Sequence, residues 1–350
     1  MNKISIISAC RNESAHIRSF LDSLLSQDMA DMQWEAVVAD GMSTDDTRAI
    51  LESYSRKHSN LRFIDNPGRI VSTGLNEAIR ASTGEIILRM DAHTRYATDY
   101  CLRCVETLEQ TGADNVGGPA RTTAQGVLPQ AIAAAYHSPF STGGAKFHDP
   151  SYEGPVDTVT YGCWRRTTLE RIGGFDETLV RNQDDELNLR LLRSGGSIWQ
   201  NPRIMSWYSP RATLSGLFHQ YFQYGFWKVA VIKKHGKPGS WRHLVPAGFA
   251  LANGLLLAAI AIAVMFSASK LLLLASILWL AMISLYASAN LIASFAAAYK
   301  SGWKLLPYLP FVFFAYHLSY GSGFLAGMFR FRSSSAGSFT NESVFARITR

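Results

Sequence analysis

Charged residues are missing from three long stretches near the carboxyl-terminal end of this sequence. The stretches without Asp, Glu, Lys or Arg include 244–266, 271–298 and 305–329. Each can hold the roughly 20 apolar residues that a membrane-spanning helix needs. The first two predict spans, and three such stretches in a row argue against core helices of a soluble protein. The third contains prolines, glycines and a histidine, so a kinked span and a re-entrant segment both stay open.

Cysteine is also scarce, with four residues in the whole chain. This number argues against a disulfide scaffold and fits a reducing compartment. Cys101 and Cys104 have C-x-x-C spacing, but no second pair follows to complete a zinc site, so we expect two small residues one helical turn apart. The amino-terminal end lacks the apolar region and cleavage site of a signal peptide, so we expect the large polar part to be cytoplasmic.

Basic residues exceed acidic ones, which gives a formal net charge of +7. Five cations crowd just before the first apolar stretch: Lys228, Lys233, Lys234, Lys237 and Arg242. Cations beside a membrane segment favour the cytoplasmic face and anionic headgroups. We therefore expect a membrane surface as the basic region's partner and no nucleic acid.

The number of spans decides where the last arginines lie. With a cytoplasmic amino terminus, three full spans would place Arg330, Arg332, Arg347 and Arg350 outside. That arrangement conflicts with the positive-inside trend. A re-entrant third segment or a cytoplasmic carboxyl terminus would remove the conflict.

Strand and helix patterns alternate through the first part of the chain. The expected strands are Lys3–Cys10, Trp34–Asp40, Leu61–Asp65 and Glu85–Asp91. The expected helices between them are Ser14–Gln27, with Ser14 as its N-cap, Asp45–Lys57 and Ile70–Ser82. The strands read as continuous apolar runs, as in a sheet that helices cover on both faces. We therefore predict an α/β domain with a mostly parallel sheet, followed by an α-helical membrane region.

The later segments divide the chain further. Ser138–Pro155 is rich in Gly, Ser, Pro and His and is interpreted as a mobile active-site loop. Leu214–Lys234 has aromatic residues and lysines on different sides, which predicts an interfacial helix on the membrane. The predicted divisions are a catalytic domain (1–212), an interfacial helix region (213–242), two or three spans (243–330) and a carboxyl-terminal tail (331–350).

Two expected strands end in an aspartate. Asp40 follows the second strand and Asp91 the fourth, so both carboxylates should lie at the carboxyl edge of the sheet, where open α/β sheets bind nucleotides. Asp40 is predicted to bind a base or ribose. Asp91 and His93 can supply two ligands to a divalent cation, Mn²⁺ or Mg²⁺, that holds a diphosphate. Two alternatives stay open: His93 hydrogen-bonds the diphosphate directly, or Asp91 is a strand-end aspartate that only caps a turn.

Three consecutive acids open the helix Asp184–Arg193. The helix dipole favours acids there, so capping alone is one explanation. The other is a general base, because clustered carboxylates raise one another's pKa and an attacking hydroxyl must lose its proton. We assign the base to Asp184, with Glu186 near it. Gln223 and Trp227, just before the membrane, are either interfacial anchors or contacts to substrate.

These motifs resemble those of family 2 glycosyltransferases with a GT-A fold, a Rossmann-like domain. The chain is similar in particular to bacterial membrane-attached enzymes that build exopolysaccharide units of the succinoglycan type on a lipid carrier. The resemblance covers about residues 3–230. It implies that Arg11–Glu13 forms the first nucleotide loop, that Asp91 is the first acid of the D-x-D motif, and that residues 162–176 contact the acceptor. It also implies that Asp184 is the base of the E-D motif.

The sequence departs from the family pattern at three positions. His93 stands where D-x-D has its last acid, and Gln183 stands where the family usually has Glu. Processive members carry Q-x-x-R-W, whereas here Phe226 precedes Trp227. With so few spans, this difference argues against a processive synthase.

Together the residues and the resemblance define one predicted site. Its donor-binding residues are Arg11, Glu13, Asp40, Arg69, Asn76 and Asp91. Its acceptor-binding residues are Gly162, Trp164, Asp185, Gln223 and Trp227. The base is Asp184, and the metal ligands are Asp91 and His93.

We expect an inverting glycosyltransferase of the bacterial inner membrane with a cytoplasmic catalytic domain. The expected donor is a nucleotide sugar such as UDP-glucose, and the acceptor is a polyprenyl-diphosphate-linked saccharide, with other polysaccharide assembly proteins as further partners. Two alternatives stay open. The acceptor could be polyprenyl phosphate itself, or the chain could be a non-catalytic membrane assembly component that keeps the fold.

Overall fold

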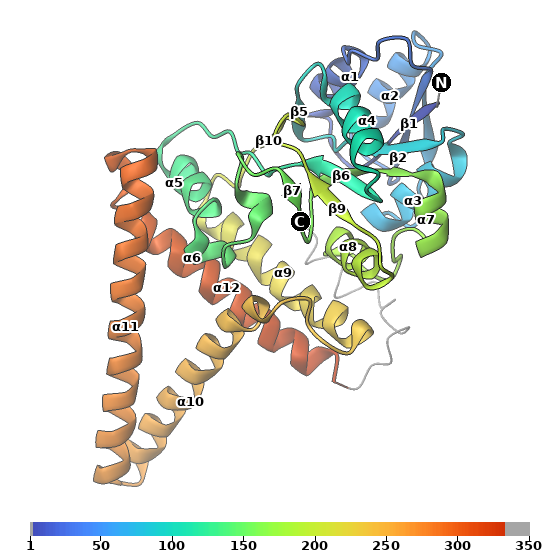
Figure 1. Cartoon of the computed structure of the whole chain (residues 1–350). Helices are drawn as coiled ribbons and strands as arrows, with labels where there is room; N and C mark the ends of the chain where they lie inside the picture. Colours follow the sequence, from blue (N-terminus) through green and yellow to red (C-terminus); the bar gives the residue numbers. More distant parts are fainter. Residues whose placement is uncertain (1–2, 333–350) are drawn as a thin grey trace. The chain divides into compact units, whose positions relative to one another are not determined.

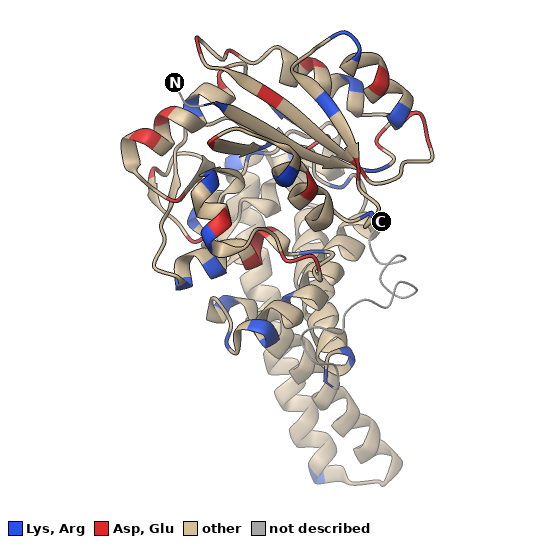
Figure 2. Cartoon of the chain, turned by 90° about the vertical axis from the view of Figure 1, so that its right-hand side faces the viewer, with Lys and Arg blue, Asp and Glu red and all other residues tan. Residues whose placement is uncertain are grey.

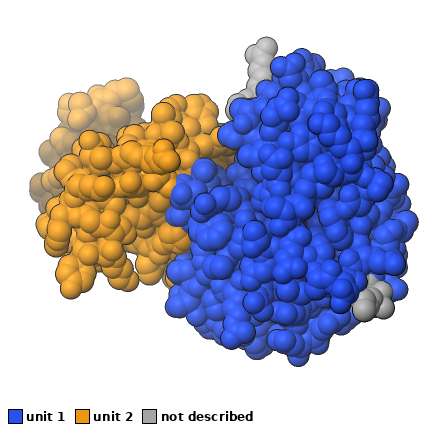
Figure 3. Space-filling view, turned by 90° about the horizontal axis from the view of Figure 1, so that it is seen from above, with its two compact units in different colours: residues 1–123, 145–209 blue, residues 124–144, 210–350 orange. Residues whose placement is uncertain are grey.

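A computed structural model describes residues 3–332, and the predicted tail with Arg347 and Arg350 lies almost wholly outside the described residues. The chain forms two compact units (Figure 3). Unit 1 comprises the chain up to Thr123 together with Ala145–Ser209. Unit 2 comprises Ala124–Gly144 together with the chain from Pro210 onward. Unit 2 thus takes an internal segment from the region that the sequence assigned to the catalytic domain.

Unit 1 is built on a mixed eight-stranded sheet (Figure 1). The order of its strands is β3-β2-β1-β4-β8-β6-β9-β7. The first four in this order run parallel, and β8 is antiparallel to both of its neighbours, β4 and β6. The strands are β1 (Ile4–Cys10), β2 (Trp34–Asp40), β3 (Leu61–Asp65), β4 (Ile86–Arg89), β6 (Asn115–Gly118), β7 (Gly154–Pro155), β8 (Thr160–Arg165) and β9 (Ile198–Gln200). A separate antiparallel pair joins β5 (Thr94–Tyr96) to β10 (Ser206–Tyr208).

Helices cover both faces of this sheet, as the continuous apolar strands require. One apolar cluster joins the sheet to α1, α2 and α4, and a second joins the other face to α3, α7 and α8. Within the strands, alternate residues enter opposite clusters: Ile6 belongs to the first and Ile7 to the second. The helices are α1 (Ile17–Leu25), α2 (Thr47–Ser55), α3 (Val71–Ala81), α4 (Tyr100–Thr111), α7 (Arg166–Ile172) and α8 (Gln183–Arg193).

The predicted parallel α/β architecture is confirmed. Each expected strand of the first half forms, and Trp34–Asp40 and Leu61–Asp65 have the predicted bounds. The predicted N-cap at Ser14 is wrong, because α1 begins after His16 and its cap makes no side-chain hydrogen bond. The segment Ser138–Pro155, expected as a mobile loop, contains α6 (Pro139–Thr142), the 3-10 turn η1 (Lys146–His148) and strand β7.

Unit 2 contains four long helices and the short helices α5 (Val127–Tyr136) and α6. The long helices are α9 (Leu214–His235), α10 (Val245–Met265), α11 (Ser269–Ser301) and α12 (Leu309–Arg330). Helix α9 packs along α12, as Figure 1 shows, and glycines permit the close approach. A Cβ atom on Gly225 would lie 2.1 Å from the carbonyl oxygen of Tyr320, and one on Gly323 would lie 2.0 Å from that of Phe222.

Within residues 3–332, two helices are long and apolar enough to cross a membrane: Trp241–Met265, which includes α10, and Ser269–Ser301, which is α11. Only 6% of the apolar window of each is buried, so they are not core helices of a soluble protein. Both are almost free of charged residues in Figure 2. Helix α12, the third predicted segment, is not among these candidate spans and packs against α9 and α10. Helix α9, expected to lie on the membrane, buries Phe226 and Trp227 within the protein.

Candidate active site

Two loops at the carboxyl edge of the sheet are joined by hydrogen bonds. The loop after β1 begins at Arg11 and the loop after β2 at Gly41, and these strands pair so that Cys10 lies opposite Asp40. The backbone N–H of Asn12 donates to Ser43 Oγ over 2.8 Å, and the N–H of Thr44 donates to Asn12 Oδ1 over 2.8 Å. These bonds hold the predicted nucleotide loop, residues 11–13, against the loop that follows β2.

Asp40 is fully buried at the end of β2. Its carboxylate accepts hydrogen bonds from the N–H of Ser43 at 3.2 Å and from Ser43 Oγ at 2.5 Å, and it pairs with Arg48 at 3.3 Å. Arg48 also pairs with Asp65 at the end of β3, over 2.7 Å. These contacts stiffen the edge of the site. A direct bond from Asp40 to a nucleotide stays a prediction, and it would need the loop after β2 to open.

The centre of the candidate site is a carboxylate pair joined by one guanidinium. Arg89, the last residue of β4, donates from Nε to Asp91 Oδ1 over 2.8 Å and from Nη2 to Asp91 Oδ2 over 2.9 Å. Its Nη1 donates to Asp184 Oδ1 in the first turn of α8. The Arg89 side chain is 4% exposed, whereas those of Asp91 and Asp184 are 17% and 41% exposed. The two acids are thus brought together, and both keep a face toward solvent.

Burial and charge act in opposite directions on this cluster. Desolvation alone would lower the pKa of Arg89, but Asp184 and Asp91 outweigh it and raise that pKa, so the guanidinium stays charged. Desolvation raises the pKa of Asp184 above its ordinary value, with Arg89 opposing and Asp91 adding to the rise. A carboxylate with a raised pKa is a better proton acceptor, which is what a general base requires.

The neighbours of Asp184 on α8 have other contacts. Glu186 is fully buried and forms a two-point pair with Arg190, at 3.0 Å to Nε and 2.8 Å to Nη2. Arg190 also donates to the carbonyl oxygen of Gly174, so this pair anchors the preceding turn. Gln183 is buried, and its Oε1 has no hydrogen-bond partner among the described residues. Glu186 therefore has a structural role, and Asp184 is the more available carboxylate.

A metal would have few protein ligands here. Among residues 3–332, no group of three or more His, Cys, Asp and Glu side chains is placed to hold an ion. Asp91 and the exposed His93 supply at most two donors, and each Asp91 oxygen keeps a lone pair beside its bond to Arg89. This donor set fits a cation that takes its remaining ligands from a diphosphate and water.

Several other predicted site residues have structural contacts. The Asn76 amide donates to the carbonyl oxygen of Phe175 and to Glu177, each over 2.8 Å, and its Oδ1 accepts the N–H of Phe175. Arg69 is exposed in the turn before α3, with a positive φ of 59°. Donor binding by both residues stays a prediction, and the bonds of Asn76 are internal.

The predicted acceptor residues of β8 lie inside unit 1. Trp164 is 1% exposed and packs edge-on against Phe175, with ring centroids 6.1 Å apart. Gly162 has a positive φ of 99°, and a Cβ atom there would lie 2.4 Å from the Trp164 ring. Acceptor contact by Gly162 and Trp164 stays a prediction that their burial does not favour. Asp185, on α8, is half-buried.

The remaining predicted acceptor residues, Gln223 and Trp227, belong to α9 in unit 2. Gln223 is 6% exposed and Trp227 is fully buried, with its ring 5.9 Å from that of Phe331. Contact between Trp227 and a substrate stays a prediction that this packing does not favour.

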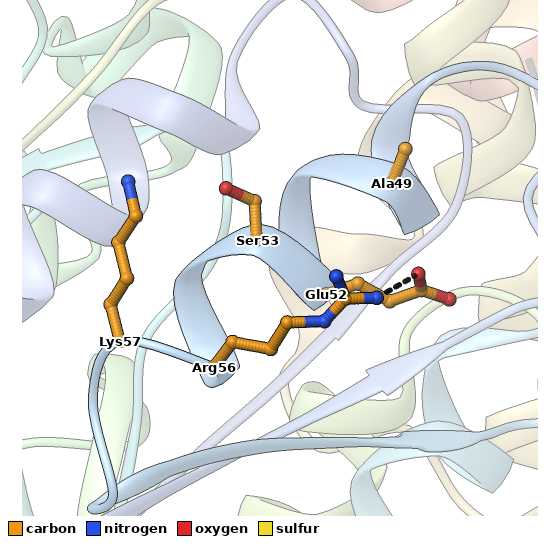
Figure 4. Close-up of a pocket in the computed structure, with 5 residues that line it drawn as sticks. All are labelled: Ala49, Glu52, Ser53, Arg56 and Lys57. Carbon is orange, nitrogen blue, oxygen red and sulfur yellow. Dashed lines mark ion pairs between the residues drawn. The ribbon is translucent and has the colours of Figure 1, made fainter.

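A hollow of about 320 Å³ lies elsewhere on unit 1 (Figure 4). It is lined by Ala49, Glu52, Ser53, Arg56 and Lys57, all on or directly after α2. Arg56 and Glu52 form an exposed ion pair there at 3.6 Å. None of the predicted site residues lines this hollow, so it is not the candidate site.

Sequence reasoning missed Arg89. The available signal was its position as the one charged residue in the apolar run Ile86–Met90, whose residues lie in a strand buried on both faces. A buried arginine needs carboxylate partners, because desolvating its charge is otherwise costly. That requirement alone would have predicted the link between Asp91 and another acid.

The model of the family described as "Glycosyl transferase family 2" matches residues 5–172. The chain is 34% identical to the succinoglycan biosynthesis protein ExoA of Rhizobium meliloti (strain 1021), over 72% of this chain and 77% of that protein.

Two further likenesses extend over nearly the whole chain. A Methanococcus voltae protein is 26% identical over 95% of this chain and 99% of its own length. It is named dolichyl N-acetyl-alpha-D-glucosaminyl phosphate 3-beta-D-2,3-diacetamido-2,3-dideoxy-beta-D-glucuronosyltransferase. The fold is also similar to that of the mannosyltransferase PcManGT of Pyrobaculum calidifontis, whose structure was solved with GDP-Man and Mn²⁺. The aligned region covers 93% of this chain and 87% of PcManGT, with a TM-score of 0.61 and 19% sequence identity. This last likeness concerns the fold.

Proposed function

We propose a reaction from the premise that the chain belongs to glycosyl transferase family 2 and is a glycosyltransferase of polysaccharide or lipid-linked saccharide assembly. The proposal is that it moves a hexose, glucose in the first instance, from a UDP-sugar to a lipid-linked saccharide with inversion at the anomeric carbon. The observation that carries this proposal is the meeting of Asp91 and Asp184 on one guanidinium. Membership of an enzyme family removes the non-catalytic alternative.

The donor is proposed to bind at the carboxyl ends of β1, β2 and β4. Arg11 and Glu13 lie in the first loop, beside the loop that Asp40 fixes. Asp91 and His93 would hold a divalent cation, Mn²⁺ or Mg²⁺, on the diphosphate. When bound, such a cation offsets the charge that develops on the leaving nucleoside diphosphate. The Mn²⁺ in the PcManGT complex supports the choice of metal.

Asp184 is proposed to act as the general base. One acceptor hydroxyl loses its proton to the Asp184 carboxylate while its oxygen attacks the anomeric carbon. The bond from that carbon to the diphosphate oxygen breaks, and the nucleoside diphosphate leaves with the bonding electron pair. Attack opposite the leaving group inverts the anomeric centre. The raised pKa of Asp184 supports its role, because it makes the carboxylate a stronger base.

A lipid-linked acceptor is proposed because the two apolar helices, α10 and α11, indicate membrane association. A tethered enzyme and a tethered acceptor share one surface, which raises their effective concentration. The name of the Methanococcus voltae relative, which includes a dolichyl-linked amino sugar phosphate, supports a sugar already on a lipid as the acceptor. We place the enzyme in the bacterial inner membrane with unit 1 on the cytoplasmic side.

The test combines a donor panel with one substitution. Membranes that contain the protein are incubated with radiolabelled UDP- and GDP-sugars, and the molecular mass of the lipid product is measured by mass spectrometry. We expect a diphosphate with a lengthened glycan, whereas one phosphate with one sugar would identify polyprenyl phosphate as the acceptor. Asp184→Asn should reduce transfer by about 100-fold or more, the range of general-base catalysis. UDP binding should persist.

The matched control is Asp99→Asn, since Asp99 is also a partly buried carboxylate that pairs with an arginine, at 2.9 Å, but it lies on the amino-terminal side of α4. Transfer by this variant should be close to that of the unmodified protein. Normal transfer by Asp184→Asn would remove Asp184 as the base and end the proposed mechanism.

A further inference from the structure

Arg89 contacts both of the carboxylates to which the proposed function assigns separate tasks. Its Nε and Nη2 hold both oxygens of Asp91, on the donor side, and its Nη1 holds the proposed base Asp184. The two acids lie far apart in sequence, one after β4 and the other on α8. The Arg89 side chain is the one described link that joins them directly by hydrogen bonds within unit 1.

The surroundings of Arg89 keep it from acting as a substrate contact. The residue is 3% exposed, so solvent and substrate reach the carboxylates and not the guanidinium. On one side its Cζ lies 5.9 Å from the ring centroid of Tyr161, within the range of a cation–π contact. Tyr161 is itself fixed by a hydrogen bond between its hydroxyl and Thr94. The guanidinium is therefore held on several sides.

We propose that Arg89 is a positioning residue that sets the distance between the donor site and the base. The inference rests on the proposed function. A guanidinium is a rigid plane with donors on several edges, so it can hold two carboxylates in one fixed arrangement, which the single ammonium of lysine cannot do. Arg89 acts on chemistry through Asp184 and on donor binding through Asp91, without touching either substrate.

The test uses Arg89→Lys, which keeps the charge and removes the bridge. The full-length protein in detergent is assayed for transfer with the sugar nucleotide identified by the panel, and for binding of UDP with Mn²⁺ by calorimetry. We expect kcat to fall about tenfold or more and the affinity for UDP to fall about fivefold, in line with couplings between residues in contact. Unchanged kcat and affinity would overturn the inference.

Two double-mutant cycles separate positioning from a general loss of structure. In an Asp184→Asn background, Arg89→Lys should change the residual kcat less than about threefold, because the carboxylate through which Arg89 affects the reaction is already absent. In an Asp91→Asn background it should change UDP affinity less than about threefold, for the same reason. Losses that simply multiply in both backgrounds would mean that Arg89 supports the fold and not the spacing of the acids.

Arg190→Lys is the matched control. Arg190 also makes a two-point pair, with Glu186, on the helix that carries Asp184, and it lies outside the proposed chemistry. Its variant should lower thermal stability but leave kcat within about threefold of normal, because it does not join the two acids. The same kinetic loss in both variants would contradict the inference. Failure of Asp184→Asn to reduce transfer would instead contradict the proposed function itself.

Discussion

Glu35 should stabilise unit 1 from the edge of the sheet opposite the candidate site. Its Oε1 accepts hydrogen bonds from the N–H of Thr83 at 2.6 Å, Thr83 Oγ1 at 2.7 Å and Ser5 Oγ at 2.9 Å, and its Oε2 pairs with Arg62 at 3.1 Å. Desolvation would raise its pKa, but the hydrogen bonds from Thr83 and Ser5 and the charge of Lys3 outweigh that effect and lower it from 4.5 to about 2. The side chain is 13% exposed, so solvent screens these bonds only partly.

The lowered pKa gives the size and sign of the effect. At about 1.4 kcal/mol for each tenfold change in proton affinity, the ionised carboxylate contributes up to about 3 kcal/mol to folding. Because the folded-state pKa lies below the unfolded value, this contribution is complete above pH 4.5 and is lost as the pH falls toward 2. Glu35→Gln should therefore destabilise the protein at pH 7, by less than the full amount since the amide oxygen still accepts.

The assay is thermal unfolding of the full-length protein in detergent, followed by circular dichroism. At pH 7 the variant should unfold several degrees lower, at roughly 2–4 °C for each kcal/mol in a unit of this size. The difference should shrink as the pH is lowered from 4.5 toward 2. A control, Glu52→Gln, removes an exposed pair on α2 and should have little effect. Equal melting of the Glu35 variant and the unmodified protein at pH 7 would refute the reasoning.

Two further predictions concern catalysis and topology. The pKa of Asp184 is raised above its ordinary value of 3.8, so the acid limb of the activity profile should lie above pH 3.8. Activity should fall as the pH decreases through that higher pKa, because protonated Asp184 cannot accept a proton. A profile of kcat/KM against pH would measure this limb. A limb at or below 3.8 would contradict the role of Asp184. A two-span topology would place both flanks of the α10–α11 pair on one side, so a reporter fused after Arg350 should report the cytoplasm. A signal from the opposite side would require a third crossing.

Much of unit 1 could be predicted because its signals are local. The parallel strands are apolar runs of the right length, and alternating helices leave few topologies to consider. The antiparallel strand β8 is harder to predict, since Thr160–Arg165 mixes polar and apolar residues and its pairing with β4 and β6 depends on contacts distant in sequence. The grouping of the internal segment 124–144 with unit 2 could not be predicted, because nothing in its composition separates it from its neighbours.

Helix α12 matches a span in length, but its composition differs from that of α10 and α11. Its tyrosines, glycines, serines and histidine lower its mean hydropathy, and it is not among the candidate spans. It packs closely on α9, where Gly225 on α9 and Gly323 on α12 each leave space for the opposing backbone. A two-span topology would put the cations before α10 and the described residues Arg330 and Arg332 after α12 on the same side of the membrane. That topology would agree with the positive-inside trend.

The candidate site also differs in charge from the pattern that it resembles. Where D-x-D supplies a second acid, this chain has His93, and the guanidinium of Arg89 at the end of β4 pairs with Asp91. One guanidinium and two carboxylates leave the joined cluster with a formal charge of −1. A nucleoside diphosphate is an anion, so the neutral His93 and the charged Arg89 both lower the repulsion that it meets at Asp91. Because the Arg89 guanidinium is buried, it lowers this repulsion without covering the exposed parts of the two carboxylates. Asp91 stays available to a cation, and Asp184 stays available to an acceptor hydroxyl.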